Sequence, residues 1–177
     1  MKSYRETLDW LYTQLPMYQR TGTFAGKIDL QKTQALMALL DHPEKLPCLH
    51  VAGTNGKGSV SHMLAAILQH SRYRTGLYTS PHLVDFRERI RVDGALIPAS
   101  YVQEFVHRYH EQFQELGLSF FEMTVGLGVD YFRQQHTEIN VLEVGLGGRL
   151  DSTNVVSPHL SIITHIGYDH MDFLGHT

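Results

Sequence analysis

A glycine-rich loop between an apolar strand and a helix is the feature that most constrains the fold of this chain. The strand covers residues 49–52, and helical periodicity follows over 57–70. The loop reads Gly53-Thr54-Asn55-Gly56-Lys57-Gly58-Ser59. Glycines bring backbone N–H groups against phosphate oxygens, and a helix N-terminus adds unsatisfied donors and the positive end of its dipole. Lys57 is placed to reach terminal phosphates, so the sequence predicts a nucleotide site.

The spacing of this loop differs from the standard Walker A motif. That motif would put its first glycine at Val51 and its hydroxyl residue at Gly58. A glycine turn with one exposed lysine therefore stays open as an alternative interpretation. The strand–loop–helix context favours phosphate binding.

Strand and helix patterns alternate through the rest of the sequence. We predict strands over 49–52, 76–79, 139–144 and 160–166. We predict helices over 4–15, 30–40, 57–70, 99–116 and 120–135, with a loop over 16–29. This alternation is typical of an α/β fold with a doubly wound, mostly parallel sheet, and 177 residues fit one domain.

Composition argues against several classes of partner. The formal net charge is -3, from 15 Lys and Arg against 18 Asp and Glu, which gives no basis for binding nucleic acid or an acidic membrane. No run approaches the roughly 20 apolar residues that span a bilayer, and residues 1–6 lack the apolar core of a secretory signal. Cys48 is the single cysteine, which suits a reducing compartment. We expect a monomeric cytoplasmic protein with no nucleic-acid or membrane partner.

Two segments resemble the signatures of a known enzyme family. Residues 49–59 resemble the ATP signature of folylpolyglutamate synthases and dihydrofolate synthases, within the Mur ligase superfamily. Residues 142–154, Leu-Glu-Val-Gly-Leu-Gly-Gly-Arg-Leu-Asp-Ser-Thr-Asn, resemble the family's other signature, and 78–83 and 167–170 are shorter matches in the family's order. The resemblance implies a P-loop domain like the central ATPase domain of Mur ligases.

The resemblance assigns a magnesium ion to Ser80, Glu143 and His170. Each residue lies at or just beyond the carboxyl end of a predicted strand, and open α/β sheets bind ligands at that edge. The oxygen atoms of Glu143 and Ser80 suit a hard cation, whereas histidine is an unusual ligand for one. A turn hydroxyl is the alternative role for Ser80.

Alternatives stay open for the other two residues as well. Glu143 could form a buried ion pair with Arg149, and His170 could bond an aspartate of its own turn. His165, His170 and His176 could also suggest zinc, but their spacing is not that of zinc motifs and no cysteine is near.

The family's contacts with its pteroyl substrate fall on two segments. By resemblance they are Ser119, Phe120, Phe121 and Glu122, and Leu150, Asp151 and Ser152. The phenylalanines could stack on a flat pterin, and Glu122 could accept hydrogen bonds from its amino group. Two phenylalanines that open a helix are also typical of a core. A third family contact aligns loosely with residues 22–25.

The resemblance implies an ATP-dependent ligase in which Lys57 is the catalytic residue. ATP would phosphorylate the carboxylate of dihydropteroate or a reduced folate, and L-glutamate would attack the acyl phosphate. Family members also carry a carbamylated lysine and a C-terminal glutamate-binding domain, which this sequence does not include. We therefore interpret residues 1–177 as the N-terminal part of the ATP-binding domain and expect it to be inactive alone. A Mur-type cell-wall ligase and a non-catalytic ATP-binding module are the alternatives.

Overall fold

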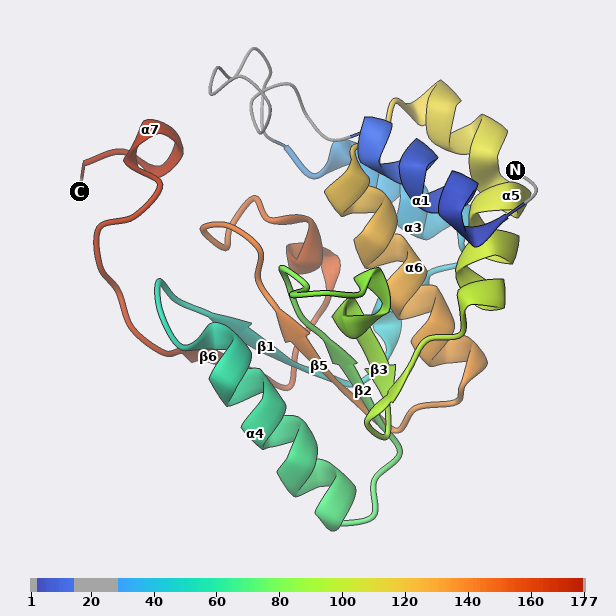
Figure 1. Ribbon diagram of the computed structural model, residues 1–177. Coiled ribbons are helices and arrows are strands. Elements are labelled where there is room, and N and C mark those ends of the chain that lie inside the picture. The colour runs from blue at the N-terminus through green and yellow to red at the C-terminus, as the bar shows by residue number, and fades with distance from the viewer. Residues whose placement is uncertain (1–2, 15–28, 177) are drawn as a thin grey trace.

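A six-stranded sheet in the order β4-β3-β2-β5-β1-β6 forms the centre of the computed structural model, which describes residues 3–14 and 29–176 (Figure 1). The strands are β1 Cys48–Ala52, β2 Thr75–Tyr78, β3 Ile90–Val92, β4 Ala95–Leu96, β5 Ile139–Glu143 and β6 Leu160–Ile163. The helices are α1 Tyr4–Thr13, α3 Gln31–Leu39, α4 Lys57–His70, α5 Ala99–Leu116, α6 Phe120–Gln134 and α7 Met171–Leu174. Short 3-10 turns are η1 Pro43–Lys45, η2 Phe86–Arg89 and η3 Ser152–Val155. The predicted α/β fold is confirmed.

Four strands of the sheet, β1, β2, β5 and β6, run parallel, while β3 and β4 form an antiparallel hairpin at one side. The register pairs Val51 with Glu143 and Ala52 with Ile163. The segments that leave these strands therefore start at the same edge of the sheet. That edge is where an open parallel sheet collects its ligands.

Helices cover the two faces of the sheet unequally. Among the described helices, α4 is the one that packs on one face (Figure 1), where Ala65 meets Val51, Leu77 and Val141 from three neighbouring strands. The helix α6 packs on the other face, and α1, α3 and α5 lie outside it (Figure 1). Every residue from Met123 to Phe132 is buried, because α6 lies between the sheet and a second layer of helices.

Two glycines in α6 permit this close packing. A Cβ at Gly126 would lie 2.6 Å from Cδ2 of Leu36 in α3, and one at Gly128 would lie 2.9 Å from Cδ2 of Tyr78 in β2. Glycine inside a helix costs roughly 1 kcal/mol relative to alanine. At these two positions the absence of a side chain lets α6 approach α3 on one side and the sheet on the other.

Most predicted elements match the structure, and the differences have local causes. The helices predicted over 57–70 and 99–116 coincide with α4 and α5, but the β3–β4 hairpin was not predicted. The strand predicted over 160–166 ends at Ile163, because the next residues bond to the glycine-rich loop. The loop predicted over 16–29 lies almost entirely outside the described residues. No helix in the described part of the chain is long and apolar enough to cross a membrane.

Asn140, the polar residue inside the apolar run of β5, is explained by a buried hydrogen-bond cluster. The Thr137 hydroxyl donates to its Oδ1 at 2.8 Å, and Asn140 Nδ2 donates to the Pro47 carbonyl at 3.1 Å. These bonds satisfy polar groups that would otherwise be costly to bury. The cluster lies where β5 begins, at the opposite end of the strand from Glu143.

Candidate active site

The glycine-rich loop joins β1 directly to α4. Gly53 has φ +135° and Gly56, the N-cap of α4, has φ +84°, conformations that residues with a side chain rarely adopt. A Cβ at Gly53 would also overlap Oγ1 of Thr164. Both glycines are therefore required by the backbone path that turns the loop into the helix.

The segment after β6 holds this loop in place. The Thr54 N–H donates to the His165 carbonyl at 2.7 Å, and the Thr54 hydroxyl both accepts from Gly167 N at 2.9 Å and donates to its carbonyl at 3.1 Å. The Thr164 hydroxyl donates to the Asn55 carbonyl at 2.7 Å. The sequence interpretation missed this clamp, because threonines at the end of a strand give no distinctive signal.

Lys57 begins α4 and curls back over the loop. Its ammonium donates to the carbonyl oxygens of Gly53 at 2.7 Å and Thr54 at 3.2 Å. The positive charge therefore lies at the helix N-terminus, beside the loop backbone. Both features favour an anion at this position.

Glu143 and Ser80 meet beside the same helix end. The Ser80 N–H donates to Oε2 of Glu143 at 3.0 Å, and the glutamate is 4% exposed. Burial raises the pKa of Glu143, while the Ser80 N–H and the charges of Lys57 and Arg89 oppose that shift. A buried carboxylate with raised pKa next to a glycine-rich loop at a helix N-terminus is characteristic of a functional site.

These groups fit the magnesium ion that the sequence predicts. A carboxylate and a serine are oxygen donors, which Mg²⁺ prefers. Gly58 leaves room on the α4 side, since even an added Cβ would be 3.5 Å from Oε1 of Glu143. No ion pair joins Glu143 to Arg149 among the described residues, so that alternative is wrong.

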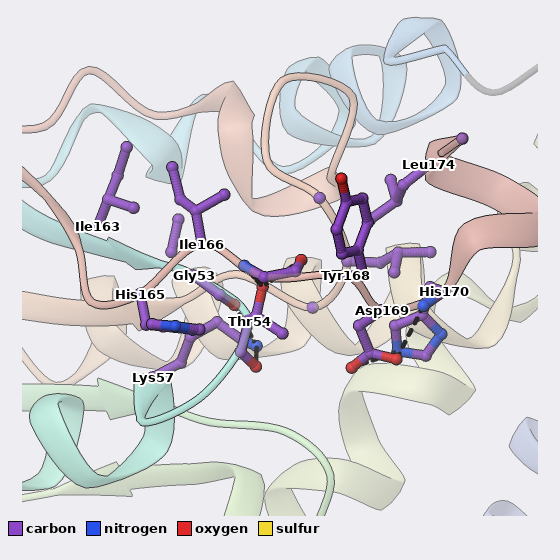
Figure 2. A pocket seen from close by; sticks show the side chains of 16 residues that line it. Gly53, Thr54, Lys57, Ile163, His165, Ile166, Tyr168, Asp169, His170 and Leu174 are labelled. Atoms are coloured by element: carbon purple, nitrogen blue, oxygen red, sulfur yellow. Dashed lines mark hydrogen bonds and ion pairs between the residues drawn. The ribbon is translucent and has the colours of Figure 1, made fainter. Parts of the chain in front are cut away.

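A cavity of about 290 Å³ opens over the loop (Figure 2). Its lining combines the glycine-rich loop, the segment after β5 and the segment after β6. Figure 2 shows Lys57 and His165 at one end and Tyr168, Asp169 and His170 at the other. The cavity therefore joins segments that lie far apart in the sequence, at the edge that the parallel strands define.

His170 lies in the wall of this cavity, next to Asp169. Its backbone N–H donates to Asp169 Oδ1 at 2.8 Å, and its Nε2 lies 3.9 Å from Asp169 Oδ2. The structure thus shows the local aspartate contact that the sequence left open. No group of three or more His, Cys, Asp or Glu side chains that could hold a metal ion occurs in residues 3–14 and 29–176.

Comparison with known proteins assigns this arrangement to a family. The Mur ligase middle domain matches residues 51–177. The folylpolyglutamate synthase of Lacticaseibacillus casei is 36% identical over 99% of this chain, and the dihydrofolate synthase/folylpolyglutamate synthase of Bacillus subtilis is 38% identical over 99% of it. The chain belongs to the Mur ligase family, in its folylpolyglutamate synthase and dihydrofolate synthase branch. It spans 41% of the length of each of these two relatives.

Solved structures of this Mur ligase branch share the fold closely. The apo form of the L. casei enzyme superimposes with a TM-score of 0.84 at 36% identity, covering 99% of this chain and 43% of that one. The E. coli enzyme FolC in complex with ADP gives 0.85 at 32% identity, covering 99% and 40%. The family resemblance and the fold that the sequence predicts are thereby confirmed.

The first predicted pteroyl segment opens α6 in this Mur ligase domain. The Ser119 hydroxyl accepts from Glu122 N at 3.3 Å, and Ser119 N donates to Glu122 Oε2 at 2.7 Å. These reciprocal bonds form a capping box. Phe120 is 4% exposed and belongs to the core, whereas Phe121 is half-buried and lies against Gly145. The core interpretation therefore applies to Phe120, and Phe121 is the more accessible ring.

A buried arginine fixes the Phe120 ring. The Arg89 guanidinium carbon lies 5.2 Å from the centre of that ring, and Arg89 Nε donates to His82 Nδ1 at 2.8 Å. The Tyr12 ring stacks on the Phe120 ring, with 5.5 Å between the two ring centroids. The sequence interpretation missed Arg89, because it alternates with two other arginines that look equivalent in the sequence.

The second predicted pteroyl segment follows the loop after β5. Leu150 is 44% exposed, Ser152 begins η3, and Asp151 is 6% exposed and caps that turn. Asp151 Oδ2 accepts from the backbone N–H groups of Gly145 at 3.0 Å and Leu146 at 2.8 Å. Asp151 thus fixes the loop beside the cavity. The loosely aligned residues 22–25 lie outside the described residues.

Proposed function

We propose that this chain is the ATP-binding part of a magnesium-dependent ligase that joins L-glutamate to the carboxylate of dihydropteroate or a reduced folate. The observation that carries the proposal is the meeting of the phosphate loop, Lys57 and the Glu143–Ser80 pair at the N-terminus of α4. Similar solved structures include an FPGS–AMPPCP–folate complex at 35% identity and E. coli FolC with DHPP and ADP at 32%.

In this proposal the chain acts by positioning and by neutralising charge. The loop N–H groups and Lys57 hold the phosphates, and Lys57 faces the oxygen charge that grows as the terminal phosphoryl group is transferred. Glu143 and Ser80 would hold the magnesium, and His170 from the cavity wall is the third ligand that we propose. That ion would supply further charge neutralisation at the transferred group.

The transfer converts a poor electrophile into a reactive one. The pteroyl carboxylate attacks the terminal phosphorus of ATP, and ADP leaves. The amine of L-glutamate then attacks the acyl phosphate carbon and releases phosphate. Residues 119–122 and 150–152 flank the loop after β5 and would form the pteroyl site, with Phe121 as the ring available for stacking and with Asp151, whose oxygens accept from protein donors, holding the loop.

Several parts of the proposal concern the protein as a whole. The chain spans about two fifths of its relatives, so we propose that glutamate binding and turnover need the C-terminal domain of the family. We propose a monomer that acts in the cytoplasm, which the buried free thiol of Cys48 suits.

The test is calorimetric binding of ATP to this chain, with and without magnesium. We expect magnesium to strengthen binding, and Lys57→Ala to weaken it by about tenfold or more, since a contact with a charged group is lost. Lys45→Ala is the matched control, because Lys45 is an exposed lysine in η1. Equal affinities for wild type and Lys57→Ala would refute the phosphate site.

Pteroate binding then separates the candidate ligands. Binding of pteroate or a reduced folate, without binding of a nucleotide-sugar, supports the folate branch. Binding of the nucleotide-sugar alone would favour a cell-wall ligase. ATP binding without any acceptor binding would favour a non-catalytic module.

A further inference from the structure

A chain of buried hydrogen bonds connects β1, η3 and the loop after β5. His50 Nε2 lies 2.8 Å from the Thr153 hydroxyl, and that hydroxyl donates to Asp151 Oδ1 at 2.5 Å. His50 is 6% exposed and Thr153 is fully buried. We propose that His50 and Thr153 are positioning residues that hold the loop of residues 145–151 in place for the acceptor substrate. The substrate part of this inference rests on the proposed function.

The direction of these bonds follows from proton counting. A threonine hydroxyl has one proton, and an ionised carboxylate only accepts. Because the Thr153 proton goes to Asp151, His50 must donate its Nε2 proton to Thr153. This fixes the imidazole as a donor at Nε2 and makes the three side chains a single directed chain.

The carboxylate at the end of this chain is fully used by the protein. Asp151 Oδ1 accepts from Thr153 N at 2.9 Å as well as from the hydroxyl, and Oδ2 accepts from Gly145 N and Leu146 N. These four donors match the about four lone-pair sites of a carboxylate. Rotation of this carboxylate would release the two loop N–H groups, so Thr153 indirectly controls the position of Gly145.

The loop that is held in this way separates the two predicted ligand sites. Gly145, Leu146 and Gly147 line the cavity above the phosphate loop. On its other side, Gly145 lies against the Phe121 ring so closely that a Cβ would overlap it. Because His50 is only 6% exposed and Thr153 is fully buried, they act on substrate through the loop and not by contact.

Amide hydrogen exchange on this chain tests the positioning role directly. We expect the Gly145 and Leu146 amides to be protected in wild type and to exchange at least about tenfold faster in Thr153→Val, the loss typical of a bond to a charged group. Thr153→Ser keeps the hydroxyl and should restore protection. Thr137→Val is the control, because it removes another buried threonine hydroxyl at the opposite edge of the sheet.

Three results would overturn the positioning role. Two come from variants: unchanged protection of both amides in Thr153→Val, or the same loss of protection in Thr137→Val. The third needs no variant: nitrogen NMR of wild type should show His50 protonated at Nε2, and protonation at Nδ1 alone would break the proposed chain. His50→Gln, whose side-chain amide can still donate, should keep the amides protected.

Pteroate binding tests the link to substrate. Thr153→Val should weaken pteroate binding by about tenfold and magnesium-dependent ATP binding by a smaller factor, because residues 145–147 also line the cavity but the glycine-rich loop has its own bonds to the segment after β6. An equal loss of affinity for pteroate and for ATP would overturn a specific role toward the acceptor. If wild type binds ATP but not pteroate, the pteroyl assignment fails, and the exchange data still decide whether His50 and Thr153 position the loop.

Discussion

Replacement of Gly58 by alanine should stabilise the fold and at the same time reduce the effect of magnesium on ATP affinity. Gly58 lies in the first turn of α4 and has ordinary helical geometry, so alanine should raise the free energy of unfolding by up to about 1 kcal/mol. The new Cβ would be 3.5 Å from Oε1 and 3.6 Å from Oε2 of Glu143, which is ordinary van der Waals contact. The variant should therefore fold normally.

The same methyl group would occupy the α4 side of the Glu143 carboxylate. A magnesium ion binds about 2.1 Å from a carboxylate oxygen, so an ion on that side would meet the methyl. We expect the magnesium enhancement of ATP affinity to fall at least about tenfold, as for one lost contact with a charged group.

Calorimetry with ATP, with and without magnesium, measures this enhancement, and thermal unfolding checks the fold. Gln69→Ala, a partly exposed position near the other end of α4, is the control. A Gly58→Ala chain that is stable and keeps the full magnesium effect would refute Glu143 as the metal ligand on this side.

Three further predictions concern packing, pH and the loop clamp. Gly126→Ala should lower the free energy of unfolding by about 1–3 kcal/mol despite its better helix propensity, because the Cβ meets Leu36; an unchanged melting temperature would contradict this. Burial lowers the pKa of His50 from 6.5, so the unfolded chain binds more protons and stability falls as pH drops below 6.5. Denaturation of His50→Gln should show a shallower pH dependence, and identical curves would exclude His50 as a cause. Thr164→Val removes the bond to Asn55 and should weaken ATP binding by about fivefold, with calorimetry as the check; unchanged affinity would show that the clamp is dispensable.

The sequence predicted those parts of the fold that depend on local pattern. Helix α4 follows from a glycine-rich loop and an apolar stripe, and α5 ends where Gly117 adopts φ +59°, as helices often do. The hairpin of β3 and β4 was missed because its strands have three and two residues, too few to show a period. The order of the strands also depends on long-range pairing, which periodicity does not contain.

The candidate site shows a different limit. Ser119 and Glu122 were interpreted as substrate contacts, yet their spacing is also that of a capping box, and the structure contains that box. Sequence shows which side chains can bond but not which bonds they already make. The same holds for Asp151, whose four protein donors were invisible in the sequence.

The two loops of the site owe their positions to different neighbours. Thr54 and Asn55 of the phosphate loop bond to the segment after β6, whereas the loop after β5 bonds to Asp151 and, through Thr153, to His50 of β1. Both sets of bonds therefore involve β1: one holds the loop that follows β1, and the other includes the His50 side chain of β1. Because bonds that share no partner act nearly independently, loss of one set of bonds should weaken the binding of one ligand more than that of the other. Measurements of ATP and pteroate on the same variants can therefore assign each clamp to its ligand.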